Sequence, residues 1–277
     1  MKWTKWRAVT VFALAAVAVL AAWWSSSKPS NDRDWSADQS VLPYIEFDGD
    51  VVSVHNIRDN DYASAGEYTP RYYDKSFRLD ELESLWFIVE PFSGWKGAAH
   101  TFLSFGFEGG DYLAVSAEIR KEKGETFSAL KGLFRRFELM YVVGDERDLI
   151  RLRTNYRGNA VCLYPAKATK EQLTTLLVDM LRRANRLREK PEFYNTLTNS
   201  CSINIARHIN KFLLDKVPYS WQIVFPGYSD KFAIKRGMID TDLPLEEARS
   251  RFNISERARK HGDAPGFSAK IRELDGA

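Results

Sequence analysis

A cysteine, a histidine and a glutamate are the residues of this sequence best suited to chemistry. Cys201 follows the polar run Thr198-Asn199-Ser200, whose side chains can satisfy the free N–H groups at a helix start, and apolar residues at helical spacing come after it. The positive end of a helix dipole lowers a thiol pKa and favours the reactive thiolate. A free cysteine is also often a small buried apolar residue, so the alternative for Cys201 is packing alone.

The histidine and the glutamate fall on facing sides of a predicted β-hairpin. Alternating apolar residues on both sides of Gly109-Gly110 predict two strands joined by a tight turn. A two-residue turn sets His100 opposite Ile119, and a one-residue bulge sets it opposite Glu118. A carboxylate beside an imidazole holds the tautomer of the ring and raises its basicity. The alternative is a structural His–Glu pair at a sheet edge.

The remaining pattern predicts an α+β domain with an antiparallel sheet packed on helices. Besides the hairpin, strands are predicted over residues 51–58, 85–92, 138–144, 148–153 and 161–164, and helices over residues 127–137, 169–188 and 245–260. The helix that Cys201 opens follows the one over residues 169–188.

The N-terminus predicts export. Residues 1–24 combine a basic flank with a run of 17 almost wholly apolar residues, close to the minimum for a membrane-spanning helix of about 17–25 residues. The flank should stay in the cytoplasm, which makes the segment an inner-membrane anchor with a periplasmic C-terminal domain; the alternative is a cleaved signal peptide. Residues 25–41 form a polar linker, residues 42–240 the domain, and residues 241–277 a C-terminal helical extension.

The composition argues against nucleic-acid binding and against a metal site. The net charge is +3 and basic residues alternate with acidic ones, so no nucleic-acid stripe is expected. No cofactor is predicted, and the four histidines lack metal-ligand spacing, so no metal site is predicted either. Cys162 is expected in the core, although an exported chain could pair it with Cys201. His208 lies two helical turns beyond Cys201 and could compete as a base.

Three motifs in order carry a resemblance to a known family. They are His100-Thr101-Phe102-Leu103-Ser104-Phe105-Gly106-Phe107, Val115-Ser116-Ala117-Glu118-Ile119-Arg120 and Tyr194-Asn195-x-x-Thr198-Asn199-x-Cys201. Together they resemble the DUF4105 family, the Lnb N-terminal periplasmic domain, which is distantly related to cysteine enzymes of the NlpC/P60 type. The resemblance implies a permuted papain-like domain with Cys201 as nucleophile and His100 as base. The orienting role of Glu118 is inferred from the hairpin.

The expected function is therefore a membrane-anchored, periplasmic, thiol-dependent acyl-transfer enzyme. Its expected partner is a membrane lipid or a lipidated or other envelope substrate. The resemblance implies a reaction like that of a lipoprotein N-acyltransferase, which Lnb itself performs. The alternatives are a cysteine amidase or peptidase and a non-catalytic envelope binding or scaffold domain. The sequence leaves the substrate, the acyl acceptor and the oligomeric state open.

Overall fold

A single large sheet forms the centre of the fold. The computed structural model describes residues 6–15, 18, 27–92, 94–262 and 264–273. Its strands are β1 (Tyr44–Asp48), β2 (Val51–Arg58), β3 (Asp61–Tyr62), β4 (Tyr68–Thr69), β5 (Tyr72–Arg78), β6 (Leu82–Pro91), β7 (Ala99–Phe107), β8 (Asp111–Arg120), β9 (Glu138–Gly144) and β10 (Cys162–Ala166). The order in the main sheet is β1-β2-β9-β8-β7-β6-β10, with β5 also paired to β2. The pairs are antiparallel except for one parallel contact between β2 and β9.

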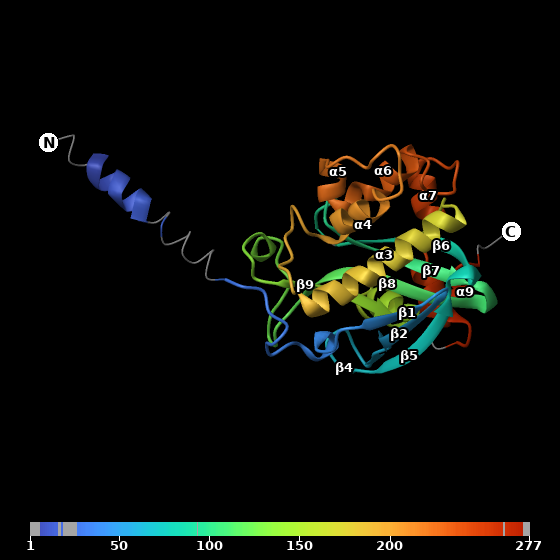
Figure 1. Ribbon diagram of the computed structural model, residues 1–277. Coiled ribbons are helices and arrows are strands. Elements are labelled where there is room, and N and C mark those ends of the chain that lie inside the picture. The colour runs from blue at the N-terminus through green and yellow to red at the C-terminus, as the bar shows by residue number, and fades with distance from the viewer. Residues whose placement is uncertain (1–5, 16–17, 19–26, 93, 263, 274–277) are drawn as a thin grey trace.

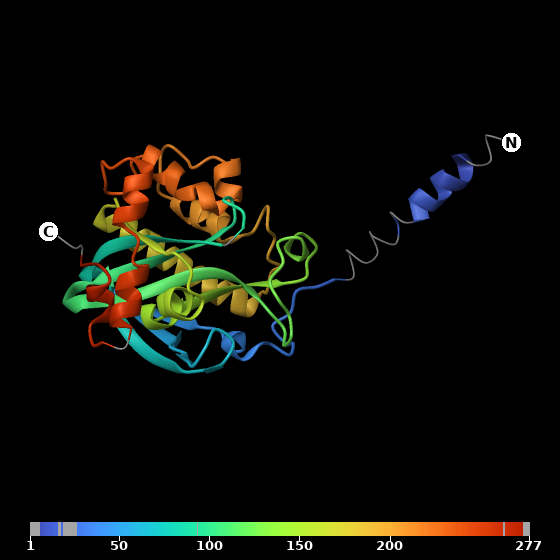
Figure 2. The same cartoon turned by 180° about the vertical axis from the view of Figure 1, so that it is seen from behind.

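Helices cover both faces of this sheet (Figure 1). They are α2 (Glu146–Arg151), α3 (Lys170–Glu189), α4 (Cys201–Ile209), α5 (Trp221–Val224), α6 (Ser229–Lys235), α7 (Leu245–Arg251), α8 (Ser255–His261) and α9 (Phe267–Lys270). Period-two alternation directs Leu103 and Phe105 of β7 toward the core beneath α3 and α4, and Phe102 toward the core beneath α2, α8 and α9. Figure 2 shows the C-terminal helices on the face opposite α3. The chain is thus a mixed α+β protein, as the sequence predicts.

Helix α3 forms where the sequence pattern predicts it. Thr169 caps it with a reciprocal capping box to Gln172, and the apolar stripe from Leu173 to Leu187 lies buried on the sheet. Because α3 rests on β1, β6 and β9, it forms a rigid support beside the shorter α4.

The register of the β7–β8 hairpin differs from the expected one. Phe107 pairs with Asp111, so Glu108, Gly109 and Gly110 form a three-residue loop instead of a two-residue turn. Both glycines have positive φ, a conformation that glycine adopts without strain. The extra loop residue shifts the register of the hairpin by one residue. Continued to the end of β7, this register sets His100 opposite Glu118 without any bulge.

Two predicted elements are wrong. Residues 127–137 contain only a 3-10 turn at Lys131–Leu133, because Phe127, Leu130 and Phe134 find no core to pack against and remain exposed. Phe137, at the end of the segment, is buried in the main core. Residues 148–153 are helical, not a strand: Asp145 accepts a hydrogen bond from the Arg147 backbone and starts α2, which continues into a π-helical turn at Leu152–Tyr156. The capping aspartate therefore outweighs the apolar run that suggested a strand.

The predicted C-terminal helix is divided in two. Between α7 and α8, the Phe252 carbonyl accepts a hydrogen bond from the Leu163 backbone N–H, and the Ile254 backbone donates to Val161. Residues 252–254 therefore add to the edge of β10, and the helix stops to make this contact.

The predicted anchor falls largely on residues 1–5, 16–17 and 19–26, which lie outside the described residues. Residues 6–15 are helical with exposed apolar side chains such as Trp6 and Phe12. Within the part of the chain that the structure describes, no helix is both long enough and apolar enough to cross a membrane.

Candidate active site

Cys201 is the first residue of α4, where the sequence predicts it. Ser200 is the N-cap, but its side chain makes no capping bond and its buried hydroxyl has no partner among the described residues. The loop before it is shaped by Asn195, whose side chain accepts hydrogen bonds from two following backbone N–H groups. Cys201 is 4% exposed and is a free thiol, as is Cys162. The helix start is therefore not capped by its own N-cap side chain.

The sheet opens where the three predicted residues meet. Strands β7 and β8 pair only from Leu103↔Val115 onward, although β7 stays paired with β6 as far as Ala99 and β8 with β9 as far as Arg120. The two strands thus part at this end while each keeps its outer neighbour. Cys201 of α4 lies on one face of the sheet. At the resulting gap it meets His100 and Glu118, which project from the other face and line the same cavity.

A short chain of hydrogen bonds links the histidine to the glutamate. The His100 Nε2 atom lies 2.7 Å from Ser116 Oγ, and that hydroxyl donates to Glu118 Oε1 over 2.9 Å. Nε2 itself lies 3.6 Å from Glu118 Oε1. Because Ser116 donates to the carboxylate, it accepts the proton of Nε2. The structure brings His100 and Glu118 together through a serine.

The electrostatics favour a charged Cys–His pair. Burial alone would raise the Cys201 pKa, but attraction to His100 and hydrogen bonds from His100 and Thr101 outweigh it and lower the pKa to about 7. Burial likewise opposes charge on His100, yet the nearby thiolate and Glu118 raise its pKa to about 9. Between these values the thiol is ionised while the imidazole still holds a proton.

A buried arginine fixes the charge of the glutamate. Burial would raise the Glu118 pKa, but the interaction with His100 and the charge of Arg153 hold it well below its usual range. The Arg153 guanidinium also contacts Glu90, with Nε 2.8 Å from Glu90 Oε2, and lies 2.9 Å from Glu118 Oε1 through Nη2. Glu118 is therefore a permanent anion behind the imidazole.

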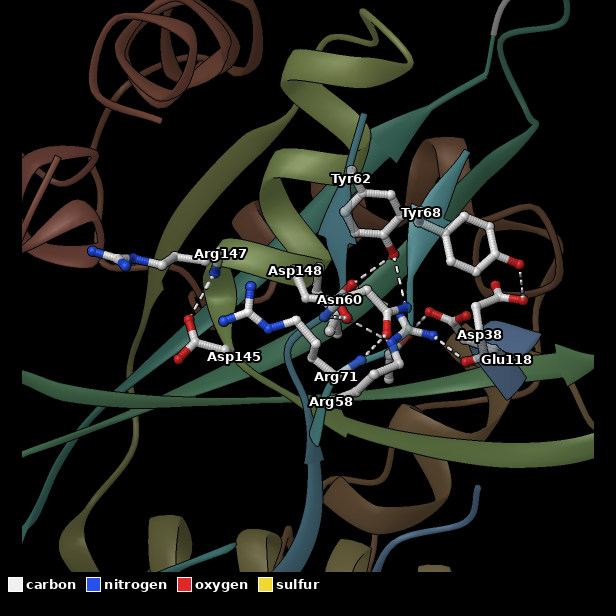
Figure 3. Close-up of polar contacts among 12 residues, drawn as sticks. Asp38, Arg58, Asn60, Tyr62, Tyr68, Arg71, Glu118, Asp145, Arg147 and Asp148 are labelled. Atoms are coloured by element: carbon white, nitrogen blue, oxygen red, sulfur yellow. Dashed lines mark hydrogen bonds and ion pairs between the residues drawn. The ribbon is translucent and has the colours of Figure 1, made fainter. Parts of the chain in front are cut away.

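A cavity of about 270 Å³ gives access to these groups. Its lining includes Cys201, His100, Glu118 and the aromatic side chains of Phe92, Phe127 and Tyr194. A second ion pair supports its inner wall, as Figure 3 shows: Arg58 donates two hydrogen bonds to the Asp148 carboxylate. The Tyr62 hydroxyl and the backbone N–H of Asn60 donate to the same carboxylate. The buried charges of Arg58 and Asp148 therefore neutralise each other beside the cavity.

Other candidates from the sequence lie elsewhere. Both ring nitrogens of His208 are engaged, Nδ1 at 2.5 Å from Asp179 and Nε2 at 2.6 Å from the Tyr141 hydroxyl. Cys162 lies on β10 in the main core, where burial raises its pKa to about 11. Among the described residues, no group of three or more His, Cys, Asp or Glu side chains could hold a metal ion.

Three contributors to the site are missing from the sequence prediction. Ser116 lies two residues from Glu118 on the same strand face, so the alternation signal could have found it. Thr101, next to His100, contributes through its backbone N–H, which helps to lower the Cys201 pKa. Arg153 gave no signal, because its π-helical turn was predicted as a strand.

Comparison with known proteins identifies the family. No curated protein and no solved structure gives a significant match. The family described as "Lnb N-terminal periplasmic domain" matches residues 68–227, more than half of the 277 residues, and the matched stretch contains His100, Glu118 and Cys201. The chain therefore belongs to the Lnb N-terminal periplasmic domain family.

Proposed function

We propose that this protein is a membrane-anchored periplasmic enzyme that transfers acyl groups through a thioester on Cys201. The observation that carries the proposal is the gap between β7 and β8, where a thiol of lowered pKa meets an imidazole backed by a largely buried carboxylate. The family description supports the periplasmic location. The anchor is proposed from the apolar run in residues 1–24.

The mechanism follows from the ion pair. The Cys201 thiolate attacks an acyl carbonyl, and the oxyanion that forms is stabilised by backbone amides at the start of α4. The intermediate collapses, the leaving group takes the proton held by His100, and a thioester remains on Cys201. An acceptor then attacks the thioester and gives its proton back to His100, which restores the thiolate. Glu118 and Ser116 hold the ring in place throughout.

The order of the site residues supports a permuted papain-like arrangement. The histidine strand and the carboxylate strand precede the cysteine helix in this chain. We infer that the substrate is lipid-linked or another acyl or amide compound of the envelope, and that the acceptor is an amine, as in a lipoprotein N-acyltransferase. With water as the acceptor, the same site would act as an amidase or peptidase.

Trapping of the acyl-enzyme tests this function. The full chain is incubated with diacylated lipopeptides and with fatty-acyl p-nitrophenyl esters, and its mass is then measured. We expect a hydroxylamine-sensitive acyl adduct on Cys201 that Cys201→Ser abolishes and Cys162→Ser, the matched control, retains. Release of the acyl group to an added amine faster than to water identifies a transferase. A full set of donors that leaves Cys201 unmodified contradicts the proposal and favours a binding domain.

A further inference from the structure

Large apolar side chains are exposed on the loops around the cavity. Six of them are between 41% and 68% exposed, a high value for residues that a globular protein normally buries. We call them the apolar rim: Phe127, Leu130, Phe134, Leu197, Tyr219 and Trp221. Phe127 also lines the cavity, so the rim begins at its edge.

Contacts join the segments of the rim into one surface. The Thr196 hydroxyl donates to the Ala129 carbonyl over 2.7 Å, which ties residues 127–134 to residues 195–198. The Tyr219 hydroxyl donates to the Leu197 carbonyl over 3.0 Å and adds the segment that leads into α5. In Figures 1 and 2 these loops lie on the side of the domain from which the N-terminal chain leaves.

The segments of the rim carry basic side chains but no acidic ones. Residues 126–137 contain Lys131, Arg135 and Arg136 and no acidic residue, and residues 193–200 and 217–228 contain no charged residue at all. Glu192, in the adjoining depression, is neutralised by two hydrogen bonds from Arg183. Exposed aromatic rings beside basic side chains match the headgroup region of an anionic bilayer. A typical protein partner surface would not require this one-sided charge.

The N-terminal chain joins the domain next to the rim. Pro29 lies in the same surface depression as Arg135, Asn195 and Thr198. The sequence predicts that the apolar run ending at Trp24 lies in the membrane, and the five residue steps from Trp24 to Pro29 span at most about 18 Å. The rim is therefore held within reach of the bilayer that receives this run.

We propose that the apolar rim docks onto the surface of an anionic lipid bilayer, so that the cavity mouth at Phe127 faces the lipid. A substrate with an acyl chain could then pass from the bilayer to the cavity without crossing water. The docking itself does not depend on acyl transfer, so it can be tested separately from the proposed function.

The test measures whether lipid touches the rim in the full chain. The nitrobenzoxadiazole fluorophore is attached at Leu130→Cys in a Cys162→Ser, Cys201→Ser background, and the protein is reconstituted into vesicles of phosphatidylethanolamine and phosphatidylglycerol with doxyl-labelled lipid. The control label is at Glu83→Cys, an exposed position near the start of β6. Glu83 and Phe92 are about 30 Å apart along the strand direction, and Phe92 contacts Phe127 of the rim, so the control label lies far from the edge of the rim.

We expect at least twofold quenching of the label at position 130 by doxyl lipid, and none at position 83. Leu197→Asp with Trp221→Asp should abolish the quenching at position 130, and a second label at Phe134→Cys should behave like the first. Equal, weak quenching at positions 83 and 130 would overturn the proposal. So would a blue-shifted emission at position 130 that is the same in lipid-free detergent and insensitive to doxyl lipid, because a protein partner or a second copy would then cover the rim.

Discussion

The His100 imidazole lies between two acids that are ionised under different conditions. On one side Glu118 stays charged, held by Arg153, and on the other Cys201 ionises near pH 7. The carboxylate favours the imidazolium, and the imidazolium favours the thiolate. The reactivity of the thiol thus depends on a residue that it does not touch.

The variant Glu118→Gln tests this dependence. Removal of the charge should lower the His100 pKa and raise that of Cys201 from about 7 toward its ordinary value. A rise of one unit reduces the thiolate fraction at pH 7 about fivefold, and the alkylation rate falls with it. Ser104→Ala is the matched control, because Ser104 lies on the same face of β7 but donates to Glu146. An unchanged thiol profile in Glu118→Gln would show that the carboxylate is only structural.

The Arg153 guanidinium neutralises the buried Glu90 and the largely buried Glu118, so its removal should destabilise the fold. Arg153→Met leaves Glu90 and Glu118 without their main cation, and breaking such a buried pair costs about 3–5 kcal/mol. Arg157→Met removes a more exposed cation, 3.6 Å from the same Glu90, and should cost less than about 1 kcal/mol. Urea unfolding of both variants gives the comparison; similar losses would mean that the buried contacts carry no special weight.

At the scale of elements, α4 is tied to its neighbours by a polar cluster at its far end. His208 of α4 contacts Asp179 of α3 and Tyr141 of β9. Burial would raise the Asp179 pKa, but hydrogen bonds from His208 and Lys211 outweigh it and lower the pKa to about 2. The cluster fixes the helix whose first residue is Cys201.

This cluster should appear in the acid stability of the protein. A carboxyl with a folded-state pKa below the unfolded value of about 3.9 stabilises the fold above pH 4, and that contribution disappears as the pH falls toward 2. Asp179→Asn should therefore lower stability at neutral pH and flatten its loss between pH 4 and 2. Urea midpoints from pH 2 to 6 measure this, with the exposed Asp215→Asn as control. Parallel curves for Asp179→Asn and the parent would contradict the assignment.

A close backbone approach to Gly227 positions the loop at residues 95–98. A Cβ on Gly227 would lie 2.0 Å from the Lys96 carbonyl oxygen, so Gly227→Ala must push this loop away. We expect a loss of about 1–3 kcal/mol in urea unfolding. At Gly66 a Cβ meets no atom within 4 Å and φ is not positive, so Gly66→Ala should be neutral or slightly stabilising. Equal effects at the two positions would argue against the tight contact.

The sequence predicts elements well where periodicity and capping agree. Helix α3 has both an apolar stripe and the Thr169 capping box, and β7 and β8 have clear alternation. It fails where local and tertiary signals compete, as at Asp145, whose cap turns an apolar run into α2. The gap between β7 and β8 is beyond any local pattern, since it arises from the pairing of each strand with its outer neighbour.

Across the whole molecule, the two cores on opposite faces of the sheet leave the candidate site next to the apolar rim. Helices α8 and α9 close one face of the sheet, α3 and α4 the other, and the gap in the sheet opens beside the loops that carry the apolar rim. The residue types of the candidate site were predictable from three short motifs. Their meeting point was not, because it depends on strands and helices from residues 90 to 201 packing together.

An ion pair between Cys201 and His100 is the basis of the proposed mechanism. It is tested most directly by the rate of Cys201 alkylation against pH in the full chain, with Cys162→Ser to leave one thiol, compared with the same chain carrying His100→Ala. We expect a half-maximal rate near pH 7, which moves toward the free thiol value of about 8.5 or above when His100 is removed. An unreactive Cys201 in the folded chain, or a pH profile that is the same with and without His100, would contradict the ion pair.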